Sequence, residues 1–292
     1  MLEGSIVALV TPMKSDGAVD WTALEKLLEW HLEKGTHGIV PMGTTGESAT
    51  LDTDEHLKVI ERTIEVVAGR IPVIAGTGSN STAEAIHQTQ EAERAGADAC
   101  LLVTPYYNKP TQDGLYAHYR EIALATSVPI VLYNVPPRTA CDMSATTVAR
   151  LSELDGIVGI KEACGNAERV KEIRDLVDEG FVILSGEDAQ TRQMLDYGAK
   201  GAISVTANIL PKEMSEFCQS FLDGDLARCE ELDSRLQPVH DVLFIEVSPS
   251  PTKWVLNQMG LIEEGIRLPL LPLSEENQIP VSNCVSKLGL IN

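Results

Sequence analysis

The sequence predicts an α/β fold, a (β/α)8 barrel of the TIM type followed by a C-terminal helical region. Eight short apolar runs recur along the chain, and each is followed by a cluster of glycine, proline or hydroxyl residues and then by helical spacing. Successive runs begin about 20 to 34 residues apart, the length of one strand–helix unit. No G-x-G-x-x-G follows the first run, which argues against an open dinucleotide-binding sheet.

The apolar runs predict strands that are buried on both faces, as in a parallel sheet covered by helices. Each run holds four or five residues without polar alternation, which is the pattern of such strands. The predicted strands cover residues 6–10, 38–42, 72–75, 99–103, 129–133, 157–160, 181–184 and 201–205.

The segments between the runs carry helix signals. Asp20 stands at an N-cap position before an apolar stripe that ends at Gly35, and Ser81 with Glu84 forms a capping-box pattern for a helix that runs to residue 95. Strand signals fade after about residue 211, and helical spacing covers residues 213–222, 226–243 and 252–259. We therefore expect a catalytic barrel over residues 1–224 and a helical region over residues 225–292.

Composition excludes several classes of partner. The 292 residues carry a formal net charge of -20, so the surface repels nucleic acid phosphates and anionic lipids, and we expect neither nucleic acid nor membrane as a partner. The first apolar run is too short for a signal peptide, which predicts a cytoplasmic protein. Six scattered cysteines without a C-x-x-C pair predict reduced thiols, and no histidine or cysteine spacing indicates a metal site.

Lys161 is the sharpest chemical feature. In this fold catalytic groups lie at the C-terminal ends of the strands, and Lys161 alone among eleven lysines directly ends an apolar run. Burial there would lower the pKa of the amine and allow it to attack a carbonyl, giving a Schiff base. The alternative is a structural lysine paired with Glu162 or Glu187, and Lys109 is a weaker candidate for the nucleophile.

Other polar residues follow neighbouring strands at the same barrel end. Tyr133, Thr44, Thr45 and Tyr107 offer hydroxyls that could carry protons or hold a carboxylate, and Arg138 offers a fork that matches a carboxylate. Each of them also has a structural reading, as a turn residue, a packing residue or a solvated charge. Their convergence with Lys161 favours the functional reading.

Six segments together resemble the dihydrodipicolinate synthase family of pyruvate-dependent class I aldolases. They are GTTGE at 43–47, AGTG at 75–78, VTPYYN at 103–108, YNVP at 133–136, GIKE at 159–162 and ISVTAN at 203–208. The resemblance extends from residue 4 to residue 272 without an obvious gap.

The resemblance implies a reaction and roles for the residues. Lys161 would form the Schiff base with pyruvate, and Tyr133, Thr44 and Tyr107 would relay protons, Tyr107 from the partner of a dimer. The second substrate would be L-aspartate 4-semialdehyde and the product 4-hydroxy-tetrahydrodipicolinate, in the diaminopimelate route to lysine. No metal or organic cofactor is implied.

Four further residues would bind substrate. Thr45 would hold the pyruvate carboxylate, Arg138 the carboxylate of the semialdehyde, and the backbone of Gly186 and Ile203 would complete the pocket. Two alternatives stay open: another Schiff-base aldolase, such as an N-acetylneuraminate lyase or a keto-deoxy-sugar aldolase, and a metabolite-binding barrel without turnover. Arg138 favours the synthase over a sugar-cleaving aldolase, because its basic fork suits an amino-acid carboxylate, whereas a sugar-cleaving site needs hydroxyl partners.

The resemblance also implies regulation and assembly. Many family members are inhibited by lysine at a dimer interface, and a histidine that some sensitive members carry is Thr53 here. We expect a homotetramer, a dimer of dimers, with a dimer as the alternative. The positions that match the family's lysine site are Ser48, Ala49, His56, Asn80, Glu84 and Tyr106.

Overall fold

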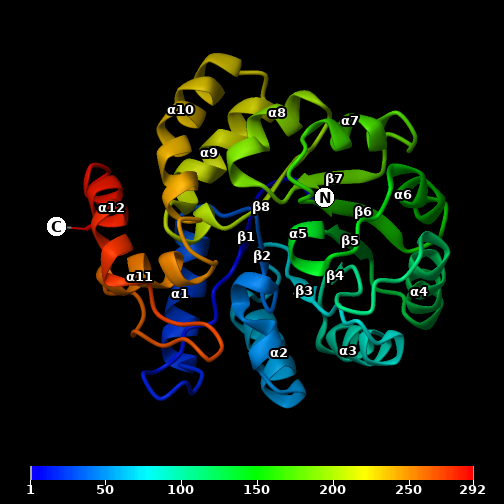
Figure 1. The fold of residues 1–292 in the computed structure, drawn as a ribbon, viewed down its shortest axis with the longest axis horizontal. Coiled ribbons are helices and arrows are strands. Elements are labelled where there is room, and N and C mark those ends of the chain that lie inside the picture. The colour runs from blue at the N-terminus through cyan, green and yellow to red at the C-terminus, as the bar shows by residue number, and fades with distance from the viewer. Residues whose placement is uncertain (1, 292) are drawn as a thin grey trace.

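A ring of parallel strands surrounded by helices forms the body of the molecule (Figure 1). The computed structural model describes residues 2–291. Within that range eight strands hydrogen-bond in the order β2-β1-β8-β7-β6-β5-β4-β3. A parallel bridge between Ile39 and Val73, and the Ile39 N–H donating to the Pro72 carbonyl at 2.9 Å, join β2 to β3. The sheet is therefore a closed (β/α)8 barrel, as predicted.

Every predicted apolar run overlaps one strand, and the predicted and observed ends differ by no more than two residues. The sixth strand continues past its predicted end, because residues 161 and 162 keep their ladder partners on β5 and β7. The strands are β1 (Gly4–Ala8), β2 (Gly38–Val40), β3 (Ile74–Gly76), β4 (Ala99–Val103), β5 (Ile130–Asn134), β6 (Ile157–Glu162), β7 (Val182–Ser185) and β8 (Gly201–Ser204).

Helices fill the connections and cover the outside of the barrel. Within residues 2–291 the connecting helices are α1 (Trp21–Glu33), α2 (Thr53–Val67), α3 (Thr82–Ala95), α4 (Gln112–Ala125), α5 (Pro136–Thr139), α6 (Ala145–Ser152), α7 (Glu168–Arg174), α8 (Thr191–Asp196) and α9 (Pro211–Leu222). The Asp20 carboxylate accepts a hydrogen bond from the Ala23 N–H at 3.0 Å, which confirms the predicted cap of α1.

The capping box at α3 is only half formed. The Ser81 hydroxyl accepts from the Glu84 N–H at 3.5 Å, as predicted. The Glu84 carboxylate, however, accepts from the Ser79 hydroxyl at 2.7 Å, and that hydroxyl also receives the Ser81 N–H. In a full capping box the Glu84 carboxylate would accept the Ser81 N–H directly. Here the Ser79 hydroxyl lies between these two groups and bonds both of them.

Two hydrophobic cores lie on opposite faces of the strands. Alternate residues of each strand point into the barrel or out toward the helices. The inner core includes Ile6, Val40, Ile74 and Tyr133, and the outer core contains most of the remaining buried apolar side chains. The alternation places Lys161 and Glu162 on opposite faces of β6.

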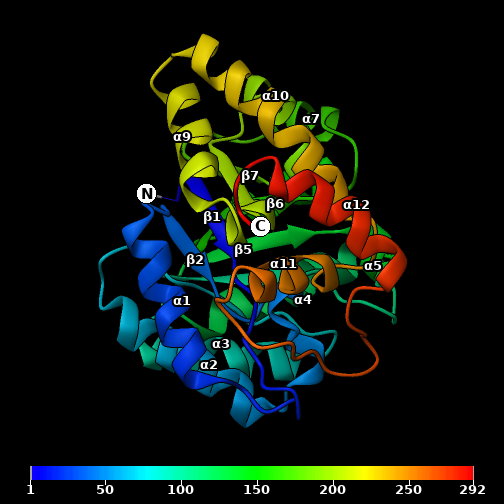
Figure 2. The same cartoon turned by 90° about the vertical axis from the view of Figure 1, so that its left-hand side faces the viewer.

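The C-terminal helices α10 (Leu226–Val242), α11 (Ser250–Gln258) and α12 (Glu275–Ser286) lie together on one side of the barrel (Figure 2). α10 and α11 match the predicted helices, while α12 was not predicted. Pro280 lies inside α12, and the helix buries only Val281 and Val285, so its apolar stripe is too short to detect. The predicted boundary at 224/225 falls between α9 and α10 and stays a prediction.

All six cysteines are free thiols, as expected from their spacing. Across residues 2–291, no helix is both long enough and apolar enough to cross a membrane.

Candidate active site

Lys161 lies inside the barrel near the C-terminal end of β6. Lys161 is only 5% exposed, and its side-chain nitrogen lies 4.4 Å from the centre of the Tyr133 ring. The two residues are direct ladder partners on the neighbouring strands β5 and β6. The structure therefore brings together the two residues that the sequence analysis paired as nucleophile and proton carrier.

Lys161 is not part of a salt bridge with any carboxylate among residues 2–291, so the predicted alternative of a rim ion pair does not hold. Glu162 points to the outer face, where its carboxylate accepts hydrogen bonds from Asn134 and Cys164. Burial raises the pKa of Glu187, and the charges of Lys161 and Arg138 oppose that rise. The rival lysine, Lys109, is exposed in the loop after β4.

Gly186 makes room for the lysine side chain. A Cβ atom at this position would lie 2.8 Å from Cε of Lys161 and 2.7 Å from Cβ of Ala163. The Gly186 N–H donates to the Glu162 carbonyl at 2.8 Å, which keeps the turn after β7 against the end of β6. The fourth predicted substrate residue, Ile203, is buried in the inner core.

Thr44 and Thr45 lie on a 3-10 turn, η1 (Thr44–Gly46), directly after β2. Glu47 follows with a left-handed backbone, φ 59°, and its buried carboxylate pairs with the Lys253 ammonium of α11. The other Glu47 oxygen accepts the Arg267 N–H at 3.0 Å. The C-terminal region thus holds the loop that carries both threonines.

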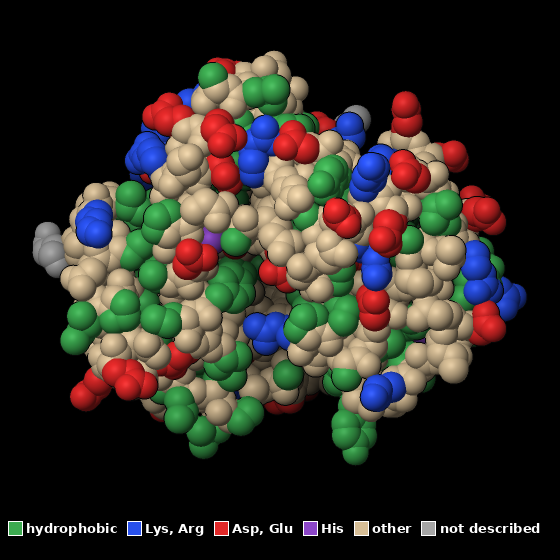
Figure 3. All heavy atoms as spheres, turned by 45° about the horizontal axis from the view of Figure 1, so that its top comes forward, with side chains coloured by type: hydrophobic (Ala, Val, Ile, Leu, Met, Phe, Trp, Pro, Cys, Tyr) green, Lys and Arg blue, Asp and Glu red, His purple; other side chains and the backbone are tan. Residues whose placement is uncertain are grey.

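A cavity of about 440 Å³ opens beside these residues. Figure 3 shows a hollow near the middle of one face, with basic and hydrophobic side chains at its rim and acidic side chains scattered over the surrounding surface. Thr44 and Arg138 line the cavity, while Tyr133 packs in the same core as Val135, which also lines it. The Arg138 side chain is not in a salt bridge with any residue of the described chain, so its fork is available to an anion.

The cavity also has a wall from the C-terminal region that sequence reasoning missed. This wall was invisible in the sequence because it depends on how the segments before α11 and α12 return to the barrel. Its residues are Val247, Ser248, Pro269 and Leu270.

Tyr107 is not brought to the cavity in the single chain. The residue is 90% exposed, has a left-handed backbone with φ 74°, and is not a lining residue of the cavity. Its predicted role across a dimer interface stays a prediction.

The six residues of the predicted lysine site gather in one place. Asn80 donates to the Tyr106 carbonyl at 3.1 Å. Burial lowers the pKa of His56, whose Nε2 lies 2.7 Å from the Gly76 carbonyl, so the ring is neutral at physiological pH. The other members of the set line the same cavity as Arg138: Ser48, Ala49, Glu84 and Tyr106.

The family model described as the dihydrodipicolinate synthetase family matches residues 1–288. The chain belongs to this family. Among its relatives, the 4-hydroxy-tetrahydrodipicolinate synthase of Pseudomonas syringae pv. syringae is 54% identical over 291 residues, which cover 100% of both chains.

Solved structures of the family have the same fold. The chloride-inhibited dihydrodipicolinate synthase of Acinetobacter baumannii, complexed with pyruvate, is 52% identical, covers 100% of both chains and superposes with a TM-score of 0.98. The enzyme of Cyanidioschyzon merolae with lysine bound is 37% identical, covers 99% of both chains and has a TM-score of 0.95. The resemblance of the six sequence motifs to this family is therefore confirmed.

Proposed function

We propose that the chain is an enzyme that condenses pyruvate with L-aspartate 4-semialdehyde to give 4-hydroxy-tetrahydrodipicolinate, in the biosynthesis of lysine. The observation that carries this proposal is the buried Lys161 amine, without a carboxylate partner in the described chain, against the ring of Tyr133. A buried amine of this kind is suited to attack a ketone. Family membership over residues 1–288 supports the same reaction.

The chemistry balances with the release of one water. The Lys161 amine attacks the ketone carbon of pyruvate, and the oxygen leaves as water to give an imine. Loss of a methyl proton gives the enamine. The enamine carbon attacks the aldehyde, which restores the imine, and the alkoxide formed from the aldehyde oxygen takes up a proton. The amine of the semialdehyde then attacks the imine carbon, closes the ring and releases Lys161.

The neighbouring residues take the roles expected from the sequence. Tyr133 and Thr44, with Tyr107 from a partner, move protons to and from the pyruvate oxygen. Thr45 holds the pyruvate carboxylate, with backbone groups of Gly186 and Ile203 beside it. Both substrates carry a carboxylate, and because the chain carries a net charge of -20, these carboxylates need local positive charge in the site.

Arg138 supplies that local charge and is proposed to bind the carboxylate of the semialdehyde. It lines the cavity and is free of salt bridges within residues 2–291. Replacement Arg138→Ala should impair use of the semialdehyde far more than formation of the pyruvate adduct. Equal loss of both would contradict this role.

Borohydride reduction with pyruvate, followed by peptide mass analysis, tests the proposal. We expect a stable adduct on the peptide that contains Lys161 and none in the Lys161→Ala variant, with Lys109→Ala as the matched control that keeps the adduct. Absence of any adduct would overturn the reaction. Offering either aspartate semialdehyde or N-acetylmannosamine to the pyruvate-loaded protein then separates the proposed reaction from a sugar-cleaving aldolase.

We also propose lysine as an inhibitor that binds in the cavity that Arg138 lines. Glu84 offers a carboxylate for an ammonium group, beside Ser48, Ala49, His56, Asn80 and Tyr106. Calorimetric titration with lysine should show binding that Glu84→Gln weakens, while the pyruvate adduct still forms. Unchanged lysine affinity in that variant would refute the assignment.

The family resemblance also leads to proposals for the assembly of the protein and its location in the cell. We propose a homotetramer built from dimers, as the family resemblance implies. The exposed Tyr107 supports the dimer within it, because that side chain would serve a site from a partner chain. Sedimentation velocity gives the state, and a dimer is the alternative outcome. A biosynthetic enzyme of this kind is proposed to act in the cytoplasm.

A further inference from the structure

We propose that Glu162 and Asn134 form a clamp on the outer face of the barrel that positions Lys161 and Tyr133 on the inner face. The inference rests on the proposed function of Lys161. It assigns a positioning role to two buried residues that do not touch the substrate. The clamp residues directly follow the reacting pair in the chain, Asn134 after Tyr133 and Glu162 after Lys161.

The geometry of the two strands couples the pairs. Tyr133 lies opposite Lys161, and Asn134 lies opposite Glu162 in the last ladder pair of β5 and β6. Because side chains alternate across a strand, the first pair points into the barrel and the second pair points outward. A contact that holds the second pair therefore fixes the backbone from which the first pair extends.

The outer pair is held by direct hydrogen bonds. The Asn134 Nδ2 group donates to both Glu162 oxygens, at 3.1 and 3.2 Å, and the Cys164 N–H donates to Oε1 at 2.8 Å. Glu162 and Asn134 are both 0% exposed. The side-chain oxygen Oδ1 of Asn134 accepts the Met143 N–H at 2.9 Å, which sets the direction of the side-chain amide.

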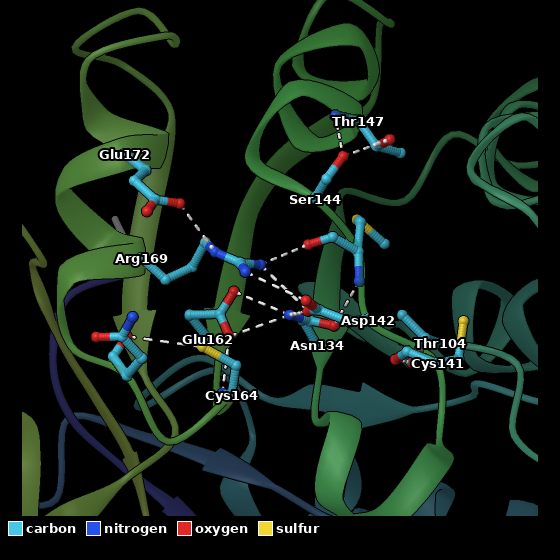
Figure 4. A network of polar contacts seen from close by, with 12 residues as sticks. Thr104, Asn134, Cys141, Asp142, Ser144, Thr147, Glu162, Cys164, Arg169 and Glu172 are labelled. Carbon is cyan, nitrogen blue, oxygen red and sulfur yellow. Dashed lines mark hydrogen bonds and ion pairs between the residues drawn. The ribbon is translucent and has the colours of Figure 1, made fainter.

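A second layer connects the clamp to the surface (Figure 4). Asn134 Nδ2 also donates to Asp142 at 2.9 Å, and the Arg169 guanidinium bonds both Asp142 oxygens at 3.1 and 3.2 Å. Glu172, on the same helix as Arg169, accepts its Nε–H at 3.1 Å. The network thus runs from the ends of two barrel strands to α7.

Hydrogen bonding favours the charged form of Glu162, and burial opposes it. Asn134 and the Cys164 N–H donate hydrogen bonds to its carboxylate, whereas burial raises its pKa to about 7. The Arg169 charge lowers the pKa of Glu162. The groups around Glu162 are Asn134 from β5, Ser185 opposite it on β7, Cys164 after β6, Asp142 after α5 and Arg169 from α7. The clamp therefore loses its charged acceptor as the pH falls through about 7.

The same titration has the opposite effect on stability. The pKa of Glu162 is higher in the fold than its usual 4.5, so ionisation costs stability, and that cost grows as the pH rises from about 4.5 to about 7. If Glu162 served stability alone, replacing its carboxylate by a neutral group would stabilise the fold at pH 8. A positioning role instead requires the charge at that pH, so activity and stability should respond in opposite directions.

The first test is Glu162→Gln, measured by the rate of borohydride-trapped adduct formation and by kcat across about pH 5.5 to 8. We expect kcat to fall roughly tenfold to a hundredfold at pH 8, the loss that a small misplacement of reacting groups causes, with a smaller change in KM for pyruvate. The melting temperature of the variant relative to wild type should improve from pH 5.5 to pH 8. Loss of activity that follows loss of stability at every pH would overturn the positioning role.

A second set of variants perturbs the clamp from the surface. Arg169→Gln removes the charge that lowers the pKa of Glu162, so the acidic limb of the pH profile should move to higher pH, and Arg169→Lys should restore it. Glu172→Gln is the matched control at the exposed end of the network and should leave the profile unchanged. If the acidic limb of the pH profile keeps its wild-type position in both Arg169→Gln and Glu162→Gln, the clamp is refuted. If wild type itself forms no adduct, the proposed function fails instead.

Discussion

The ion pair between Glu47 and Lys253 allows a sharp test of how the C-terminal region supports the site. Lys253 is 5% exposed and Glu47 is 2% exposed, and the pair joins α11 to the loop that carries Thr44 and Thr45. Replacement Lys253→Met removes the cation and leaves the Glu47 carboxylate buried, with the Arg267 N–H at 3.0 Å as its remaining partner.

The expected loss follows from the burial of the pair. Removing one partner of a buried ion pair costs about 3–5 kcal/mol, because the other charge is left uncompensated. With an unfolding entropy of about 2 cal/mol/K per residue over 292 residues, the melting temperature should fall by about 5–9 °C. The double variant Glu47→Gln/Lys253→Met should recover most of the loss, since no lone charge stays buried.

Urea unfolding followed by circular dichroism measures the differences in free energy of unfolding, and thermal unfolding measures the shift in melting temperature. The matched control is Lys212→Met, which removes a partner of Glu216 from a surface pair with a separation of 3.8 Å and should cost about 0–1 kcal/mol. The rate of pyruvate adduct formation should fall in Lys253→Met and stay unchanged in the control. A Lys253→Met variant as stable as the control would refute the reasoning, as would a double variant less stable than the single one.

Two further predictions concern the surroundings of Lys161. Gly186→Ala should destabilise the fold by about 1–3 kcal/mol through overpacking and slow adduct formation, because the new methyl group would lie 2.8 Å from Cε of Lys161; a wild-type trapping rate would contradict this. Burial, followed by the charge of Glu162, raises the pKa of the Cys164 thiol to about 12. Iodoacetamide should therefore label partly exposed Cys164 slowly near pH 8, and the rate of a free cysteine peptide would refute that expectation.

The eight strands could be predicted because their burial pattern is written in consecutive residues. Strands covered on both faces show as unbroken apolar runs, and all eight runs proved to contain strands. Strand ends were less accurate, since pairing with neighbours rather than composition carried β6 to Glu162. Helix α12 escaped prediction because only Val281 and Val285 of its residues are buried.

The candidate site could be predicted as far as chemistry follows strand ends. Lys161, Tyr133, Thr44 and Arg138 each stand at or just after a strand, and parallel strands bring such positions to one end of a barrel. The Lys161–Tyr133 pairing then required only adjacent strands. By contrast, the outward direction of Glu162 separated it from Lys161, although the two are neighbours in the chain.

The sequence by itself determined the barrel and the set of candidate reacting groups that it collects, because both depend on local patterns of burial and strand ends. Tertiary structure alone decided which acid supports which part of the site. Glu47 meets Lys253 across 206 positions, and Glu162 meets Asn134 across 28. Such contacts between distant segments leave no local pattern, since each partner's residue type is compatible with many surroundings until the chain folds.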